Sequence, residues 1–154
     1  MDTGHESAPL LVSACLAGMH CRYDGRAATD PAVRAEVDAG RAVPVCPELL
    51  GGLTSPRRPA ESTGDGTEVL DGTARVRDTD GVDVTEQYVS GARRALAIAQ
   101  AVGATRAVLH DRSPSCGSRH RYDGSFAGRL VPGTGVTAAL LARHGITVTP
   151  PTPT

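Results

Sequence analysis

The sequence predicts a single α/β domain of the Rossmann-like kind, in which helices flank a mostly parallel sheet and a small β-hairpin is attached. Short apolar runs alternate along the chain with segments of helical periodicity, as in such domains. The chain has 154 residues, of which 40% are hydrophobic, so one core can be built and two domains would be cramped. We expect the domain to span residues 10–149, between a flexible N-terminus over 1–9 and a disordered tail over 150–154.

The first part of the domain is predicted as strand, helix and strand. The apolar run Pro9–Ala14 indicates a buried strand that ends in a polar loop. Asp30 followed by Pro31 offers an N-cap with proline at the first helical position, and Gly40 marks the end of that helix. A second short strand follows over residues 41–45, and its proline favours an early or edge position.

The middle of the chain has less regular patterning. Residues 47–66 show neither helical nor strand periodicity, so we expect a long ordered loop on the surface. The pair Asp71-Gly72 favours a type I′ turn, and the segments 67–70 and 73–77 on either side of it predict the small hairpin.

A longer helix is predicted from Asp83 or Thr85 to about Val102. Asp83 and Glu86 have the spacing of a capping box, and Gly103 marks the end. The remaining elements are a third strand, a loop, a last helix and a final strand, over residues 105–110, 111–124, 134–145 and 146–149.

Three of the four cysteines, Cys15, Cys46 and Cys116, fall at or just after the ends of predicted strands. Since the carboxyl ends of parallel strands share one edge, we expect these thiols to lie together. Each sits in a Gly-, Pro- or Ser-rich loop, which favours metal or cluster ligands over core thiols because such loops aim backbone amides at sulfur. No Cys-x-x-Cys pair is present, so zinc ribbons and bacterial ferredoxins are not indicated.

The fourth cysteine, Cys21, leaves two kinds of site open. A fourth thiolate would close the coordination of a metal centre, whereas three thiolates leave one position for a substrate. Cys21 follows Cys15 by six residues and can reach the same site or form a local redox pair with it. We favour a bystander role.

Glu48 is the candidate for proton transfer or water activation. It follows Cys46 by two residues, with a proline between them that restrains the carboxylate near whatever the cysteine binds. The alternative is a surface glutamate that caps the turn at Gly51 and Gly52.

Serine hydroxyls surround the third cysteine. Ser113 precedes Cys116 by three residues and offers a hydrogen bond to a substrate or a cluster, as does Ser115, although either could simply form a turn. His110 and His120 flank this loop and are interpreted as polar surface side chains.

The tetrapeptide Arg-Tyr-Asp-Gly occurs twice, at residues 22–25 and 121–124. From the first copy, Arg22, Tyr23 and Asp24 are candidate substrate contacts, because an aromatic ring and hydrogen-bonding groups suit a flat heterocycle. Arg57, in the long loop, is a further candidate, with a solvated basic turn as its alternative.

Composition excludes several classes of function. A net charge of −1 and 3% aromatic residues argue against nucleic-acid binding, and no apolar run is long enough to span a membrane. All 16 basic residues are arginine, which excludes lysine nucleophiles. Because no secretion signal is present, we expect a cytoplasmic location and no disulfide framework.

A cysteine phosphatase is the competing enzyme class. Phosphate-binding loops of that class have five residues between the cysteine and the arginine, whereas six residues lie between Cys15 and Arg22.

Three long motifs resemble those of the thiouracil desulfidase family, in the same order, over about residues 10–148. They are LVSACLAGMHCRYDG, VPVCPELLGGL, and DRSPSCGS followed by YDGSFAG and PGTGVTAALL. The resemblance implies an α/β domain that holds an oxygen-sensitive [4Fe-4S] cluster through Cys15, Cys46 and Cys116. One iron would then be free to bind the sulfur of a thiolated pyrimidine such as thiouracil.

The implied reaction is hydrolysis of C=S to C=O with release of sulfide and no net redox change. The resemblance places Glu48 and Ser113 where the family has its acid/base and hydrogen-bonding groups. Free thiouracil, a thionucleoside and thiolated tRNA are all chemically open as substrates, and the charge and composition argue against RNA. A non-catalytic module that carries a closed cluster or another metal is the alternative function.

Overall fold

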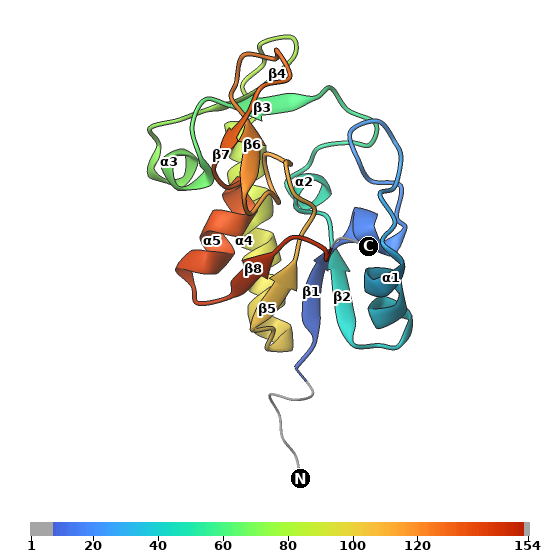
Figure 1. Ribbon diagram of the computed structural model, residues 1–154. Coiled ribbons are helices and arrows are strands. Elements are labelled where there is room, and N and C mark those ends of the chain that lie inside the picture. Colours follow the sequence, from blue (N-terminus) through green and yellow to red (C-terminus); the bar gives the residue numbers. More distant parts are fainter. Residues whose placement is uncertain (1–7, 153–154) are drawn as a thin grey trace.

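A parallel sheet of four strands forms the centre of the structure, a computed structural model that describes residues 8–152 (Figure 1). The spatial order is β2-β1-β5-β8, and each neighbouring pair is parallel. The α/β class with a mostly parallel sheet is therefore confirmed. The strands are β1 (Leu10–Ser13), β2 (Ala42–Val45), β5 (Arg106–Val108) and β8 (Thr147–Thr149).

Helices cover both faces of the sheet because the residues of β1 alternate between two buried environments. Leu11 packs with side chains of α4 (Thr85–Val102) and α5 (Val136–Arg143) on one face. Val12 packs with Val33 of α1 (Pro31–Asp38) on the other, and both β1 side chains are completely buried.

The predicted ends of two helices are confirmed. The Asp30 side chain accepts hydrogen bonds from the amides of Ala32 and Val33 and so caps α1. Helix α4 ends at Val102, followed by Gly103 with φ of 75°. The edge position expected for the second strand is also confirmed, since β2 lies at one end of the sheet.

The hairpin predicted over residues 67–77 is wrong. Residues of its first arm form the helix α3 (Gly66–Asp71), and Gly72 ends that helix with φ of 84°. The reason is a capping box formed by Asp65 and Glu68, which selects a helix before the Asp-Gly pair is reached. A glycine with positive φ suits a helix end as well as a hairpin turn, so the Asp-Gly signal was ambiguous.

The capping box predicted for α4 is also wrong. The N-cap residue of α4 is Val84, without a side-chain hydrogen bond. Asp83 instead accepts a hydrogen bond from the amide of Thr85 and an ion pair from Arg75.

Two small hairpins lie beyond the carboxyl ends of the sheet strands, at the top of Figure 1. One pairs β3 (Ala60–Ser62) with β4 (Val76–Asp78), and the other pairs β6 (His120–Tyr122) with β7 (Leu130–Pro132). Both include residues that the sequence predicted as loop, because strands of three residues are too short to show periodicity.

Helix α2 (Pro47–Leu50) also lies in the segment predicted as loop, and it packs directly on α4. Gly51 and Gly91 make this contact possible. A Cβ atom at Gly51 would overlap the carbonyl oxygen of Gln87, and one at Gly91 would overlap that of Pro47. The close approach of the two helices therefore requires glycine at both positions.

Within the part of the chain that the structure describes, no helix is both long and apolar enough to cross a membrane. Of the flexible N-terminus expected over residues 1–9 and the disordered tail expected over 150–154, residues 1–7 and 153–154 lie outside the described residues.

Candidate active site

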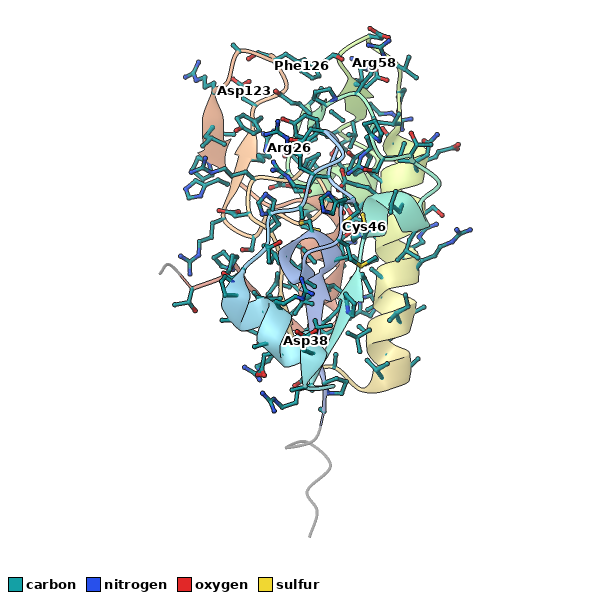
Figure 2. All side chains as sticks on the ribbon, turned by 90° about the vertical axis from the view of Figure 1, so that its right-hand side faces the viewer. Arg26, Asp38, Cys46, Arg58, Asp123 and Phe126 are labelled. Carbon is teal, nitrogen blue, oxygen red and sulfur yellow. The ribbon has the colours of Figure 1, made fainter. Side chains whose placement is uncertain are left out.

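Three cysteines meet at the carboxyl end of the parallel sheet. Cys15 lies in the short 3-10 helix η1 (Ala14–Ala17) that continues β1, Cys46 directly follows β2, and Cys116 lies in the loop after β5. Cys46 packs against the buried cluster that contains Cys15, and, besides burial, the negative charges that Cys15 and Cys46 carry when ionised raise the pKa of Cys116. All are unpaired thiols. Figure 2 shows Cys46 between the body of the sheet and the outer loops.

Burial dominates the acidity of two of these thiols. It raises the pKa of Cys15 to about 11, and the charge of Cys46 adds to the shift. It also raises the pKa of Cys116 far above the usual value, against the effect of a hydrogen bond from Ser13. The pKa of Cys46, in contrast, is lowered to about 7, mainly by a hydrogen bond with the Cys21 thiol. The two buried thiols would need a cationic metal centre to lose their protons.

Glu48 extends from the first turn of α2, and its charge acts on all three thiols. Its Oε2 atom accepts a hydrogen bond of 2.7 Å from the Tyr88 hydroxyl and an ion pair of 3.1 Å from Nη2 of Arg57. The side chain is only 13% exposed. Glu48 is therefore a nearly buried group at the thiol site rather than a surface cap of the following turn.

Ser113 and Ser115 occupy different environments. The Ser113 hydroxyl oxygen accepts hydrogen bonds from the amides of Ser115 and Cys116, at 3.0 and 3.1 Å, so it shapes the turn that holds the cysteine. Its own proton remains available for donation. Ser115 is completely buried, and its hydroxyl is bonded to that of Thr137 at 2.7 Å. This geometry gives Ser115 a packing role rather than contact with a substrate.

The first Arg-Tyr-Asp-Gly copy lies at the rim of the site. Arg22 is half-buried, and its charge acts on Cys15 and His110. Its guanidinium lies 5.7 Å from the centre of the Tyr23 ring, which is 41% exposed. Asp24 is exposed and uses Oδ1 to accept the amide of Arg26.

Arg57 reaches the site but is occupied by protein partners. Its Nη1 atom donates to the carbonyl oxygens of Cys21 and Thr54, each at 3.0 Å, while Nη2 pairs with Glu48. The side chain is 8% exposed. The structure therefore directs its terminal nitrogens toward the protein rather than toward solvent.

Cys21 joins the other three cysteines at this edge of the sheet. It is 4% exposed, and its carbonyl oxygen accepts a hydrogen bond from the Cys46 thiol at 3.9 Å. Its own pKa is strongly raised, first by the hydrogen bond with the Cys46 thiol and then by burial. Cys21 is thus a buried neighbour of Cys46, and Cys46 is the donor in the contact between them.

Three residues of the site were missed by sequence reasoning. Ser13 bonds Cys116 and also accepts the amide of His110 at 2.9 Å. His110 is half-buried instead of on the surface, and its pKa is lowered by burial and by the charge of Arg22. Tyr88, in α4, was given no role from the sequence. The feature that could have identified Tyr88 is its hydroxyl group, because the hydroxyl of a buried tyrosine needs a hydrogen-bond partner.

The residues present fit an iron–sulfur cluster. Three thiols come from three separate strand ends, as suits a cluster that binds each thiolate at a different iron. The Ser13 hydroxyl and backbone amides direct hydrogen bonds at these sulfurs, as outer-shell groups of such sites do. Between residues 8 and 152, no three His, Cys, Asp or Glu side chains form a group that could hold a single metal ion.

Comparisons with known proteins agree with this chemistry. Residues 10–151 match the family model described as 2-thiouracil desulfurase. A Bacillus subtilis (strain 168) protein described as uncharacterized protein YbbK is 49% identical over 140 residues, which covers 90% of this chain and 93% of the relative. A solved structure described as the [4Fe-4S]-dependent thiouracil desulfidase TudS matches with a TM-score of 0.83 at 42% identity, covering 92% of this chain and 89% of the other.

Proposed function

The chain belongs to the 2-thiouracil desulfurase family, and from this premise and its own site we propose that it is a [4Fe-4S]-dependent thiouracil desulfidase. The overall reaction replaces sulfur by oxygen at a pyrimidine carbon. One water enters, its oxygen becomes the new carbonyl oxygen, and its two protons leave with the sulfur as hydrogen sulfide. No electron is gained or lost, so no external oxidant or reductant is needed.

Cys15, Cys46 and Cys116 would hold the cluster. Bound there, a cluster with one iron free of protein ligands supplies a soft Lewis acid that polarises the carbon–sulfur bond. Ser13 supports Cys116 by a hydrogen bond, and the backbone carbonyl of Cys21 orients the Cys46 thiol.

The other side chains handle protons and orientation. Glu48 accepts a proton from the attacking water, and Ser113 donates a hydrogen bond from its free proton to the substrate. Arg22 and Tyr23 bind the pyrimidine at the rim, where one offers positive charge and the other a partly exposed ring face. Asp24 shapes the loop that carries both.

One observation supports this assignment above the others. The charge of Glu48 acts on all three candidate ligands, so a carboxylate lies where the cysteines would hold a cluster. In a purely structural metal centre, a nearly buried carboxylate beside the ligands would be a disadvantage, because its negative charge repels the thiolates that bind the metal.

The test is anaerobic reconstitution followed by counting of iron and sulfide and an assay of sulfide released from 2-thiouracil and 4-thiouracil. We expect about four irons and four sulfides per chain, with sulfide release. Glu48→Ala should lower turnover about 100-fold to 10,000-fold and keep the cluster absorption. Glu86→Ala, at an exposed glutamate of α4, should leave both unchanged. A loaded protein that releases no sulfide from any thiopyrimidine would contradict the proposal.

A closed, non-catalytic centre is the second candidate, because Cys21 lies against Cys46. Cys21→Ser separates the two. If Cys21 is not a ligand, the iron count and the visible spectrum of the reconstituted variant match those of the wild type. If the spectrum of the Cys21→Ser variant shows one cluster-bound thiolate fewer than that of the wild type, the closed centre is favoured.

The natural form of the substrate and its location are finer parts of the proposal. A thionucleoside is the second substrate to assay, since the exposed Tyr23 ring borders the outside of the site. A reducing compartment, the cytoplasm, suits a site built from unpaired thiols.

A further inference from the structure

The carboxylate of Glu48 is held by one oxygen only. The Tyr88 hydroxyl and the Arg57 guanidinium both donate to Oε2, at 2.7 and 3.1 Å. Across residues 8–152, no hydrogen bond joins Oε1 to another protein group. The two oxygens of this carboxylate are therefore not equivalent.

Both donors are themselves fixed. Tyr88 is 2% exposed and lies in the hydrophobic core cluster, so its ring has no room to turn away. The Arg57 side chain is tied by Nη1 to two carbonyl oxygens, and its backbone amide donates to the Tyr23 carbonyl at 2.7 Å. These restraints keep both groups in place without help from the carboxylate.

The contact between α2 and α4 sets the distance between Tyr88 and Glu48. Gly51 follows Glu48 by three residues and Gly91 follows Tyr88 by three residues, so each glycine lies on the same helix face as its partner. The two glycines allow the helix backbones to touch. This close approach brings the phenol hydroxyl of one helix onto the carboxylate of the other.

From this geometry we propose that Tyr88 and Arg57 are positioning residues of the desulfidase. They anchor Oε2 of Glu48 so that Oε1 alone receives the proton of the attacking water. The positive charge of Arg57 also offsets the repulsion between the carboxylate and three neighbouring thiolates. Neither residue contacts the substrate in this arrangement, and the role assigned to Arg57 replaces the substrate contact expected from the sequence.

This inference rests on the proposed function, and the main test uses the reconstituted enzyme. Tyr88→Phe removes only the hydroxyl. We expect kcat for thiouracil to fall about 10-fold to 100-fold, the range for a hydrogen bond to a charged group, with KM and the iron and sulfide counts unchanged. Tyr122→Phe, in β6, is the matched control and should keep full activity.

A double-mutant cycle separates positioning from a general structural effect. Because Tyr88 acts through Glu48, adding Tyr88→Phe to the Glu48→Gln variant should cause no further loss of activity. The activity of both variants is measured as residual sulfide release over long incubations. Equal losses in both backgrounds would overturn the proposal, as would an unchanged kcat in Tyr88→Phe. Arg57→Lys should lower kcat in the same way and serves as the second variant if Tyr88→Phe does not fold.

A spectroscopic readout tests the contact independently of turnover. With tyrosine labelled by ¹³C at Cζ, the protein has three such carbons, and Glu48→Gln should shift one resonance, which Tyr88→Phe removes. If that resonance does not move, the anchor is absent. Failure of the wild type to release sulfide would instead contradict the proposed function and leave this spectroscopic result interpretable.

Discussion

Residues 22–25 and 121–124 have the same four amino acids in the same order, the first copy in a loop and the second at the end of β6. Their turns are alike. In each, Oδ1 of the aspartate accepts the amide two residues later, at 3.0 Å for Asp24 and 2.9 Å for Asp123. In each, the glycine has a positive φ, 76° at Gly25 and 96° at Gly124.

The arginines of the two copies do different things. Arg22 lies over Tyr23 and its charge acts on the thiol site. Arg121 is directed into the protein, where Nη1 donates to the carbonyl oxygens of Ser62 and Tyr122, at 3.0 and 3.1 Å, and so ties β6 to β3. Local sequence therefore decides the turn, and the surroundings of the turn decide whether its arginine serves the site or the fold.

The largest difference should appear at the two glycines. Alanine at either position is strained by the positive φ, by about 1–2 kcal/mol. At Gly124 a Cβ would also lie 2.9 Å from the Ser62 carbonyl oxygen, whereas at Gly25 the nearest atoms, from Pro56, are 3.9 Å away. We expect Gly124→Ala to lower the free energy of unfolding by about 3 kcal/mol and Gly25→Ala by about 1 kcal/mol, in urea titrations. Equal losses would mean that the two turns have the same packing.

The arginines should give opposite phenotypes. Arg22→Ala should raise KM for thiouracil about tenfold and leave Tm nearly unchanged, because it removes the substrate contact that we propose. Arg121→Ala should lower the free energy of unfolding by about 1–3 kcal/mol through its lost hydrogen bonds, with kcat/KM unchanged in the folded fraction. Steady-state kinetics and thermal unfolding on both variants check this. The reverse pattern would assign the functional copy to residues 121–124.

Tyr23 should have a smaller effect that depends on its ring. Tyr23→Ala removes the face under the Arg22 guanidinium, a contact of about 0.5–1 kcal/mol at exposed sites, and should raise KM about 2-fold to 5-fold. Tyr23→Phe keeps the ring and serves as the control. If both variants raise KM alike, the hydroxyl rather than the ring contributes to binding.

The smallest effect concerns pH. The pKa of Asp123 is lowered, first by the hydrogen bond from the Ser125 hydroxyl. A carboxyl whose pKa is lower in the folded state contributes stability above its unfolded pKa of about 3.9, and this contribution is lost as the pH falls through the folded pKa. Asp123→Asn should therefore lower Tm slightly at pH 7, and the gap should close below about pH 4. A gap that persists in acid would assign the effect to hydrogen-bond geometry rather than to charge.

Several features followed from the sequence because their causes are local. Asp30 and Pro31 begin α1, Gly103 follows the end of α4, and short apolar runs form the sheet. The meeting of Cys15, Cys46 and Cys116 was also predictable, since parallel strands of one sheet share their carboxyl edge.

Local signals failed where two of them competed. Asp71-Gly72 indicated a hairpin turn, but the capping box of Asp65 and Glu68 began a helix that the same glycine ends. Both interpretations agree with the local chemistry of glycine, and the capping box selects the helix, while β4 pairs with the distant β3 instead of with residues 67–70.

The sequence by itself determined the fold class, the edge of the sheet where three cysteines end their strands, and the acidic residue that follows one of them. Only the tertiary structure decided which side chains hold the cysteines and the acidic residue in place. Tyr88 meets Glu48 from 40 positions away, and the Ser13 hydroxyl accepts the His110 amide across 97 positions. The physical reason is that hydrogen bonds depend on distances of a few tenths of an ångström between side chains, and those distances are set by helix and strand packing, which no local pattern of residues encodes.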